Sequence, residues 1–333
     1  MNFKAFSENE DSVKERKKIM LDLLLQIVLL VVGFVMLIKG ADWFVEGASK
    51  IADKFGIPQL VIGLTIVAMG TSAPEAAVSI SAAMKQNAGI TIGNVVGSNI
   101  MNIFLILGIT SAITAIGVQV STIKYEIPFL IIISILLPVL GSMGGTVNLL
   151  DGIIMWVLFI LYLLYLLRMA KKGQAVMEEV PAGEKNDSIW KLILMVLVGG
   201  VCIVVGSDVT VDAATAIAKV FGMSDRLIGL TIVAFGTSLP ELITSVTAGM
   251  KGKADIAIGN IVGSNIFNIL FVVGTTALIT PVEFASNFVI DSAIATTAAV
   301  MLLLFVLKDK KLKRWGGITM LVSYAAYFVY LLV

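Results

Sequence analysis

The sequence contains no histidine and only one cysteine, Cys202, among its 333 residues. Without histidine, the chain lacks the usual proton shuttle near neutral pH and the usual ligand of transition metals. The single cysteine lies within an apolar run and excludes a disulfide framework. Charged residues make up 14% of the chain, whereas an average soluble domain has roughly 25%. These absences disfavour histidine- or cysteine-based chemistry and a fold surrounded by water.

Apolar residues dominate instead, at 58% of the chain with a mean hydropathy of +0.99. Apolar runs of about 20 residues are long enough to cross a bilayer as helices. We therefore expect an all-α integral membrane protein. No cleavable signal peptide is expected, because the first run continues without a small-residue cleavage site. The clearest runs are Leu23–Ile38, Ile127–Leu140, Val147–Leu167, Ile189–Val205, Phe288–Leu307 and Gly316–Val333.

An internal repeat is the most informative feature of what remains. Residues 40–110 align with residues 206–276 at a constant offset of 166, and 38 of the 71 pairs are identical. Identity peaks at residues 70–75 (GTSAPE) against 236–241 (GTSLPE), and at residues 93–103 (GNVVGSNIMNI) against 259–269 (GNIVGSNIFNI). Gly, Pro, Ser, Asn and Glu belong at membrane depth only where they line an enclosed site. Two copies of one half-site point to a transporter.

The repeat also predicts the organisation of the chain. We expect ten spans, five in each half, so that the second half enters the membrane from the opposite side as an inverted repeat. Both termini are predicted outside the plasma membrane, because 16 of the 24 Lys and Arg then lie on the inner side. The expected segments are a polar N-terminal tail (1–19), the first repeat (20–168), a short cytoplasmic linker (169–188) and the second repeat (189–333).

The first motif of each half predicts a broken helix that carries a carboxylate. Pro74 removes a backbone donor, and Gly70 loosens the helix four residues earlier. The carbonyls of residues 68–71 should therefore lack intrahelical partners, and Glu75 follows in the first turn of the next half-helix. Glu241 repeats this arrangement, so the two carboxylates should face each other near the midplane.

Two carboxylates that share a dry site repel each other, and one would take up a proton unless a cation lies between them. Ca²⁺ prefers six to eight oxygen ligands, whereas Mg²⁺ holds its waters more firmly. Soft metals are disfavoured because no His or Cys is near. The pair therefore predicts a Ca²⁺ site and leaves proton binding open.

The second motif supplies glycines for close helix packing, Gly93 and Gly97. Ser98 and Asn102 are four residues apart and so share one helical face, as do Ser264 and Asn268. Four further asparagines fall on other faces and are expected to form hydrogen bonds between helices. They are Asn94, Asn99, Asn260 and Asn265.

Together the paired motifs resemble the α-repeats of the sodium/calcium exchangers of the calcium/cation antiporter superfamily, over nearly the whole chain. The resemblance implies ten helices in two inverted halves. It implies a Ca²⁺ site formed by Glu75, Glu241 and the backbone oxygens of Thr71 and Thr237. It also implies Na⁺ or supporting positions at Ala68, Ser72, Ser98, Asn102, Ala234, Ser238, Ser264 and Asn268. Asn268 departs from several members that carry aspartate there, so the coupling ratio and potassium dependence stay open.

The predicted function is alternating-access antiport that extrudes cytosolic Ca²⁺ in exchange for inward Na⁺. Exchange for H⁺, or for Na⁺ with K⁺, would use the same glutamates. A channel is disfavoured by occluded broken helices, and an intramembrane hydrolase by the lack of a Ser–His, Ser–Lys or Asp–Asp constellation. We expect no enzyme activity, no cofactor, no nucleic acid and no obligate protein partner. The partners are the two ions and the lipid bilayer. The roles of Asp42, Glu46, Asp208 and Asp212 stay open.

Overall fold

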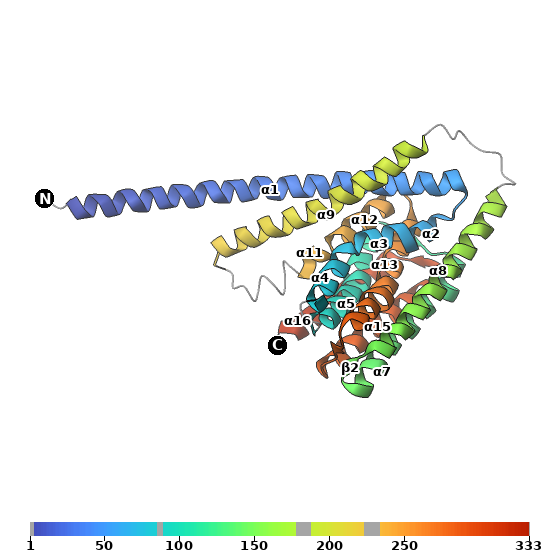
Figure 1. Cartoon of the computed structure of the whole chain (residues 1–333). Coiled ribbons are helices and arrows are strands. Elements are labelled where there is room, and N and C mark those ends of the chain that lie inside the picture. The colour runs from blue at the N-terminus through green and yellow to red at the C-terminus, as the bar shows by residue number, and fades with distance from the viewer. Residues whose placement is uncertain (1–2, 85–88, 178–187, 223–233, 333) are drawn as a thin grey trace.

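The computed structural model describes residues 3–84, 89–177, 188–222 and 234–332, and every structural statement below concerns these ranges. The secondary structure is almost entirely helical (Figure 1). Segments labelled η are π-helical. The elements are α1 (Phe3–Phe55), α2 (Gln59–Ile62), η1 (Gly63–Val67), α3 (Ala68–Thr71), α4 (Ala73–Met84), α5 (Gly89–Met101), η2 (Asn102–Leu107), α6 (Gly108–Ile113), β1 (Ile116–Gly117), η3 (Thr122–Glu126), α7 (Ile127–Gly144), β2 (Thr146–Val147), α8 (Leu149–Met177), α9 (Ile189–Val220), α11 (Ala234–Thr237), α12 (Leu239–Met250), α13 (Ala254–Phe267), η5 (Asn268–Val273), α14 (Gly274–Ile279), β3 (Val282–Glu283), α15 (Asn287–Leu307), β4 (Lys311–Leu312) and α16 (Arg314–Leu332).

Several of these helices are long and apolar enough to cross a membrane. Within the described ranges there are seven, and an eighth arises if the bent pair Gln59–Thr71 and Ala73–Met84 is one span. The two members of that pair meet at 47°. The prediction of an all-α membrane protein is therefore confirmed.

The first helix, α1, is a single rod of 53 residues. At about 1.5 Å per residue it is roughly 80 Å long, far more than the ~30 Å hydrocarbon core of a bilayer. Residues 3–19, expected as a polar tail, continue this helix without a break. Its apolar residues between Met20 and Ile38 are largely exposed, as expected for a surface that faces lipid rather than water.

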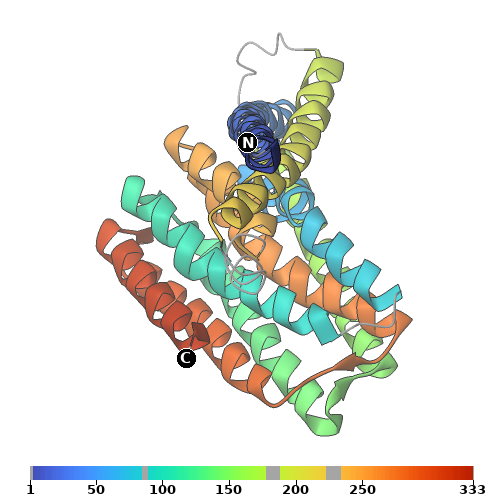
Figure 2. The same ribbon diagram turned by 90° about the vertical axis from the view of Figure 1, so that its left-hand side faces the viewer.

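Helices α1 and α9 pack against each other on one side of the remaining helices (Figures 1 and 2). Glycines at the crossing allow this approach. A Cβ atom on Gly199 would lie 2.7 Å from the carbonyl oxygen of Gly40 and 2.7 Å from the nitrogen of Phe44. A Cβ atom on Gly206 would lie 3.0 Å from the carbonyl oxygen of Gly33. Small residues at contacts of this kind are how helices associate in lipid, where no hydrophobic force drives them together.

Helix α13 lies at the centre of the helices other than α1 and α9, and it is buried along almost its whole length. It packs on the first broken helix, with a Cβ on Gly259 placed 3.0 Å from Leu64 N and one on Gly263 placed 2.8 Å from Leu64 O. The close contacts are thus made by Gly259 and Gly263, in the second copy of the motif, and not by Gly93 and Gly97, for which close packing is predicted. A Cβ on Gly93 would make only ordinary contact with Phe288, at 3.6 Å. A Cβ on Gly97 would have no described atom within 4 Å, and the repeat counterpart of the segment around Leu64, residues 223–233, lies outside the described residues.

Two short antiparallel strand pairs connect the first half of the chain to the second. In one, β1 pairs with β4, and in the other β2 pairs with β3. Helix α7 is followed by Gly145, whose φ of +69° is accessible to glycine at little cost. The Gly145 carbonyl accepts a hydrogen bond from Phe284 N at 2.9 Å, which extends the β2–β3 contact. These pairs fix the ends of α7, α15 and α16 around the central helices.

Candidate functional site

The first half of the site is built on the break between α3 and α4. Ser72 N donates to the carbonyl of Ala68 at 3.0 Å, and Ala76 N donates to the carbonyl of Ser72 at 3.1 Å. Between them Pro74 has no N–H to offer Gly70. The predicted break is confirmed at this place. The prediction that the Ala68 carbonyl lacks an intrahelical partner is wrong, because the helix continues for one bond beyond Thr71.

The second half repeats the break around Ser238, whose carbonyl accepts Leu242 N at 3.1 Å. Because Pro240 has no N–H, it cannot donate a hydrogen bond to the Gly236 carbonyl. That carbonyl accepts a hydrogen bond from a hydroxyl on another helix instead. Ser207 Oγ on α9 donates to it at 2.8 Å. The preceding segment, 223–233, lies outside the described residues, and Ala234 is described only as the first residue of α11.

The two breaks bring Glu75 and Glu241 into one enclosed site, and neither side chain is exposed at all. Each glutamate accepts a hydrogen bond from the serine of the opposite repeat. Ser72 Oγ donates to Glu241 Oε1 at 2.7 Å, and Ser238 Oγ donates to Glu75 Oε1 at 3.3 Å. The motif residues predicted to meet across the two halves therefore do so.

Asparagines of the second motif tie α5 and α13 together in a reciprocal pattern. Asn99 Nδ2 donates to the Asn265 carbonyl at 3.3 Å, and Asn265 Nδ2 donates to the Asn99 carbonyl at 3.1 Å. Asn102 Nδ2 donates to Asn265 Oδ1 at 2.8 Å, and Asn268 Nδ2 donates to Asn99 Oδ1 at 3.2 Å. Asn102 and Asn268 each begin a π-helical segment, a backbone form that is frequent at functional sites.

The remaining asparagines hold the glutamate helices in place. Asn94 Nδ2 donates to the Glu75 carbonyl at 3.2 Å and to Ser79 Oγ at 2.9 Å. Asn260 Nδ2 donates to the Glu241 carbonyl at 3.4 Å and to Ser245 Oγ at 2.9 Å. The predicted role of the four asparagines in bonding between helices is thus confirmed. Sequence reasoning missed Ser79 and Ser245, although their identity at the repeat offset was the available signal.

Other predicted site residues line the same region. Thr71 Oγ1 lies 3.0 Å from Asn260 Oδ1, and Ser264 Oγ donates to the Ala68 carbonyl at 3.3 Å. Ser98 is buried, and Thr237 is half-buried at the end of α11. The carbonyl of Ala68 therefore already accepts bonds from both its own helix and α13.

Four buried oxygen atoms of this site have no hydrogen-bond partner: Glu75 Oε2, Glu241 Oε2, Asn102 Oδ1 and Asn268 Oδ1. Buried acceptors without partners are costly and call for an ion or water between them. Two carboxylate oxygens and two amide oxygens would offer a cation hard, oxygen-only ligands, with two negative charges when both glutamates are ionised. No cluster of three or more His, Cys, Asp or Glu exists within the described ranges. The ligand set suits an alkali or alkaline-earth cation better than a transition metal.

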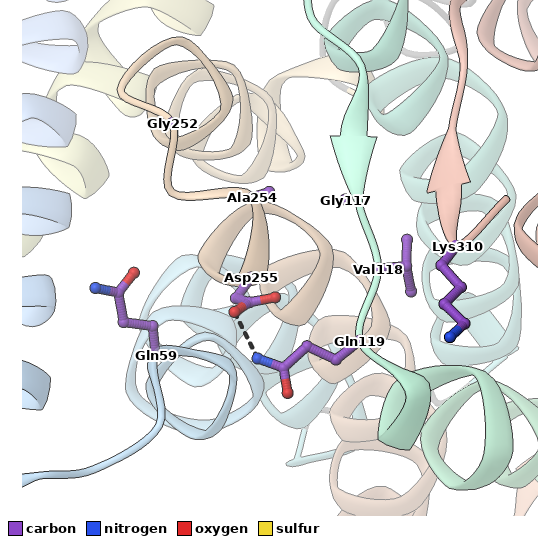
Figure 3. Close-up of a pocket in the computed structure, with 8 residues that line it drawn as sticks. All are labelled: Gln59, Gly117, Val118, Gln119, Gly252, Ala254, Asp255 and Lys310. Carbon is purple, nitrogen blue, oxygen red and sulfur yellow. Dashed lines mark hydrogen bonds between the residues drawn. The ribbon is translucent and has the colours of Figure 1, made fainter. Parts of the chain in front are cut away.

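A separate surface pocket of about 290 Å³ lies at the N-terminal end of α13 (Figure 3). Gln119 Nε2 donates to Asp255 Oδ2 there at 2.6 Å, and Lys310 also lines the pocket. Neither Glu75 nor Glu241 lines this pocket, so it is distinct from the enclosed glutamate pair. It brings one carboxylate and one ammonium group to the same opening.

Membrane-length helices around an enclosed site of carboxylate and amide oxygens define a multi-pass membrane transport protein. Comparison with known proteins identifies the family. The model of the sodium/calcium exchanger protein family matches residues 25–168 and 191–333. The sodium/calcium exchanger MaX1 of Methanosarcina acetivorans is 33% identical over 342 residues, covering 91% of this chain and 97% of that protein. The inner membrane protein YrbG of Escherichia coli is 36% identical over 269 residues, covering 78% and 82%.

A solved structure of the sodium-calcium exchanger NCX_Mj, soaked with Na⁺ and Ca²⁺, matches with a TM-score of 0.79 at 34% identity. The match covers 92% of this chain and 98% of that one. The chain belongs to the sodium/calcium exchanger family. The family consists of antiporters rather than enzymes, and its transported ions are Na⁺ and Ca²⁺.

Proposed function

We propose that this protein exchanges Ca²⁺ for Na⁺ by alternating access and extrudes cytosolic Ca²⁺. The observation that carries the proposal is the set of four unpartnered oxygens contributed by Glu75, Glu241, Asn102 and Asn268. A single Ca²⁺ among them would cancel both carboxylate charges and give all four oxygens a partner. Backbone oxygens of Thr71 and Thr237 and water would complete its shell.

Sodium would compete for the same glutamates. Ala68, Ser72 and Ser98, with Ala234, Ser238 and Ser264 in the second half, supply hydroxyls and carbonyls around them, a ligand type that Na⁺ uses and a proton does not need. Binding of either ion would neutralise the glutamates, whereas an empty site would leave two charges in a low-dielectric interior. Only loaded states would then reorient at an appreciable rate, which couples the two fluxes.

The proposed architecture is ten helices in two inverted repeats, residues 20–168 and 189–333. It is supported by the reciprocal hydrogen bonds of the site. Asn99 and Asn265, 166 residues apart, each donate to the carbonyl of the other, and the serine of each repeat donates to the glutamate of the opposite repeat. An inverted repeat of this kind can open alternately to either side by exchanging the conformations of its halves. The proposed location is the plasma membrane, with both termini outside.

Exchange of Ca²⁺ for H⁺ is the second candidate. It is favoured by one observation: Asn268 and Asn102 are neutral, so the site holds only the two glutamate carboxylates. Two protons would neutralise that pair as completely as one Ca²⁺ does.

The test is Ca²⁺ uptake into proteoliposomes loaded with Na⁺, compared with vesicles loaded with choline at the same pH. Uptake only with Na⁺ inside is expected, and it should be lost in Glu75→Gln and Glu241→Gln but kept in Asp309→Asn, an exposed carboxylate paired with Lys313. Uptake that ignores Na⁺ and follows an imposed pH gradient would replace the proposal with the proton-coupled one. Transport that survives both glutamine variants would refute the site.

A further inference from the structure

A further buried carboxylate, that of Glu126, lies outside the site described above. It is the last residue of η3, directly before α7, and only 1% of it is exposed. The enclosed glutamate pair is built from α3, α4, α12 and the asparagine helices, whereas Glu126 faces α8. The repeat motifs and the proposed function give this residue no role.

The surroundings of Glu126 are hydroxyl groups. Tyr165 OH on α8 donates to Glu126 Oε1. Tyr162 precedes Tyr165 by three residues on α8, and Thr122 precedes Glu126 by four residues in η3. Phe129 stacks on the Tyr162 ring at a centroid distance of 5.6 Å and closes the cluster on its apolar side.

Three oxygen atoms of this cluster have no hydrogen-bond partner: Glu126 Oε2, Tyr162 OH and Thr122 Oγ1. The residues that carry them are at most 6% exposed. One unpartnered buried oxygen can be an accident of packing. Three in one cluster, one of them on the carboxylate itself, repeat the situation at the enclosed glutamate pair, which also has several unpartnered oxygens.

The charge of the cluster sets the ligand class. Within the described ranges, no lysine or arginine forms an ion pair with Glu126. A buried carboxylate is neutralised either by a proton or by a compensating positive charge. One carboxylate is neutralised by one monovalent cation, whereas a divalent ion would leave an uncompensated charge. Oxygen-only ligands select a hard ion.

The backbone supports the same assignment. Glu126 ends a π-helical segment, and the two segments that begin at Asn102 and Asn268 have this form as well. A π-helix shifts the hydrogen-bond ladder by one residue and is frequent at functional sites.

We propose that Glu126 Oε2, Tyr162 OH and Thr122 Oγ1 bind an alkali cation, Na⁺ or K⁺, at a site separate from the transported ions. The other half of the chain offers a matched control. There Tyr327 OH donates to Asp291 Oδ1 at 3.3 Å, and Tyr324 stands three residues before Tyr327 as Tyr162 stands before Tyr165. Asp291 is only half-buried and can be solvated, so it does not require a bound cation.

The first test measures thermal unfolding of the purified full chain in NaCl, KCl and choline chloride at equal ionic strength, with Ca²⁺ present throughout. An alkali-dependent rise of several degrees in Tm is expected in the wild type and in Asp291→Asn, and its loss is expected in Glu126→Gln. The rise should persist in the Glu75→Gln/Glu241→Gln double variant, because the two sites are separate. A rise that persists in Glu126→Gln would overturn the proposal.

The second test is independent of the stability of any variant. Crystals of the wild type soaked in Tl⁺, a heavy substitute for K⁺, should show an anomalous density peak at coordination distance from Glu126 Oε2. Na⁺ that competes with Tl⁺ should remove the peak if the site prefers Na⁺. Absence of any peak, together with a Tm that does not depend on the alkali ion, would show that the hydroxyl groups and a proton satisfy Glu126 without a metal ion.

Discussion

Each of the four polar side chains at the centre of the site forms a hydrogen bond through one atom and has a second, buried oxygen without a partner. Asn102 and Asn268 donate through Nδ2, and their Oδ1 atoms have no partner. Glu75 and Glu241 accept through Oε1 and have a free Oε2. This division fixes the orientation of the amides and the carboxylates before any ion arrives. Little reorganisation is then needed on binding, which favours affinity.

The serine–glutamate bonds lead to the first prediction. Ser72→Ala removes a donor 2.7 Å from Glu241 Oε1. A hydrogen bond to a charged group contributes about 1.5–3 kcal/mol, so Ca²⁺ affinity should fall by roughly one to two orders of magnitude. Calcium binding or the KM for uptake would measure this. Ser323→Ala, which removes only a bond to the carbonyl of its own helix, is the control. Equal affinities in both variants would contradict the role given to Ser72.

At the scale of elements, the sequence predicted what local rules determine. Gly70, Pro74 and Glu75 placed the break and its carboxylate correctly. The sequence did not reveal that α1 already begins at Phe3, within the expected polar tail. It also did not reveal that π-helical segments begin at Asn102 and Asn268. Nor could it show which distant group bonds the carbonyl left by Pro240, because the Ser207 hydroxyl comes from α9, 29 residues away. The break at Pro74 is a local property of the sequence, but the partner of a freed carbonyl is set by the tertiary structure.

The Ser207 bond has no counterpart in the first half, where the residue at the equivalent repeat position is Ala41. It therefore attaches α9, but not α1, to a helix break. We expect Ser207→Ala to change the maximal rate of exchange more than the KM for Ca²⁺, because no glutamate contact is lost. Ser207→Thr keeps the hydroxyl and should keep the wild-type rate. Rates that are equal in the wild type and Ser207→Ala would show that the bond does not limit reorientation.

The crossing of α1 and α9 gives a prediction about stability. Gly199→Ala would place a Cβ 2.7 Å from backbone atoms of α1, and backbone cannot move as a flexible side chain does. Overpacking of this kind costs about 1–3 kcal/mol, so the Tm of the purified protein should fall by several degrees. Gly144→Ala is the control, because a Cβ there has no described neighbour within 4 Å and the residue ends α7 at the surface. A Tm for Gly199→Ala equal to that of the control would mean that the two helices separate freely.

For the molecule as a whole, polar contacts join the α1–α9 layer to the central helices. One of them involves Lys251 at the end of α12, whose Nζ lies 3.0 Å from Asp42 Oδ1 and 3.1 Å from the Asp42 carbonyl oxygen. Glu46 also approaches Lys251 at 4.0 Å and pairs with Lys50 at 2.9 Å. Because these groups are partly exposed, the ion pairs contribute little stability, about 0–1 kcal/mol each. Contacts this weak can exchange if the layer moves against the central helices during the proposed alternating access.

Whole-molecule transport also makes the charge of the cycle measurable. If three Na⁺ enter for each Ca²⁺ that leaves, one positive charge moves inward per cycle, and a potential of 100 mV contributes about 2.3 kcal/mol. Because each 1.36 kcal/mol is a factor of ten, the Ca²⁺ gradient at equilibrium should change about 50-fold per 100 mV. Proteoliposomes clamped with K⁺ and valinomycin would show this shift.

A Ca²⁺ gradient that does not respond to voltage would instead indicate an electroneutral cycle. Asn268 makes this outcome informative, because the enclosed site has two carboxylates and two Na⁺ or two H⁺ would neutralise them. Asn268→Asp adds a third carboxylate at a position whose Oδ1 has no partner. If charge balance in the site sets the stoichiometry, this variant should gain voltage dependence that the wild type lacks. If the wild type already moves one charge per cycle, hydroxyl and carbonyl dipoles must stabilise the third Na⁺, and Asn268→Asp should leave the voltage response unchanged.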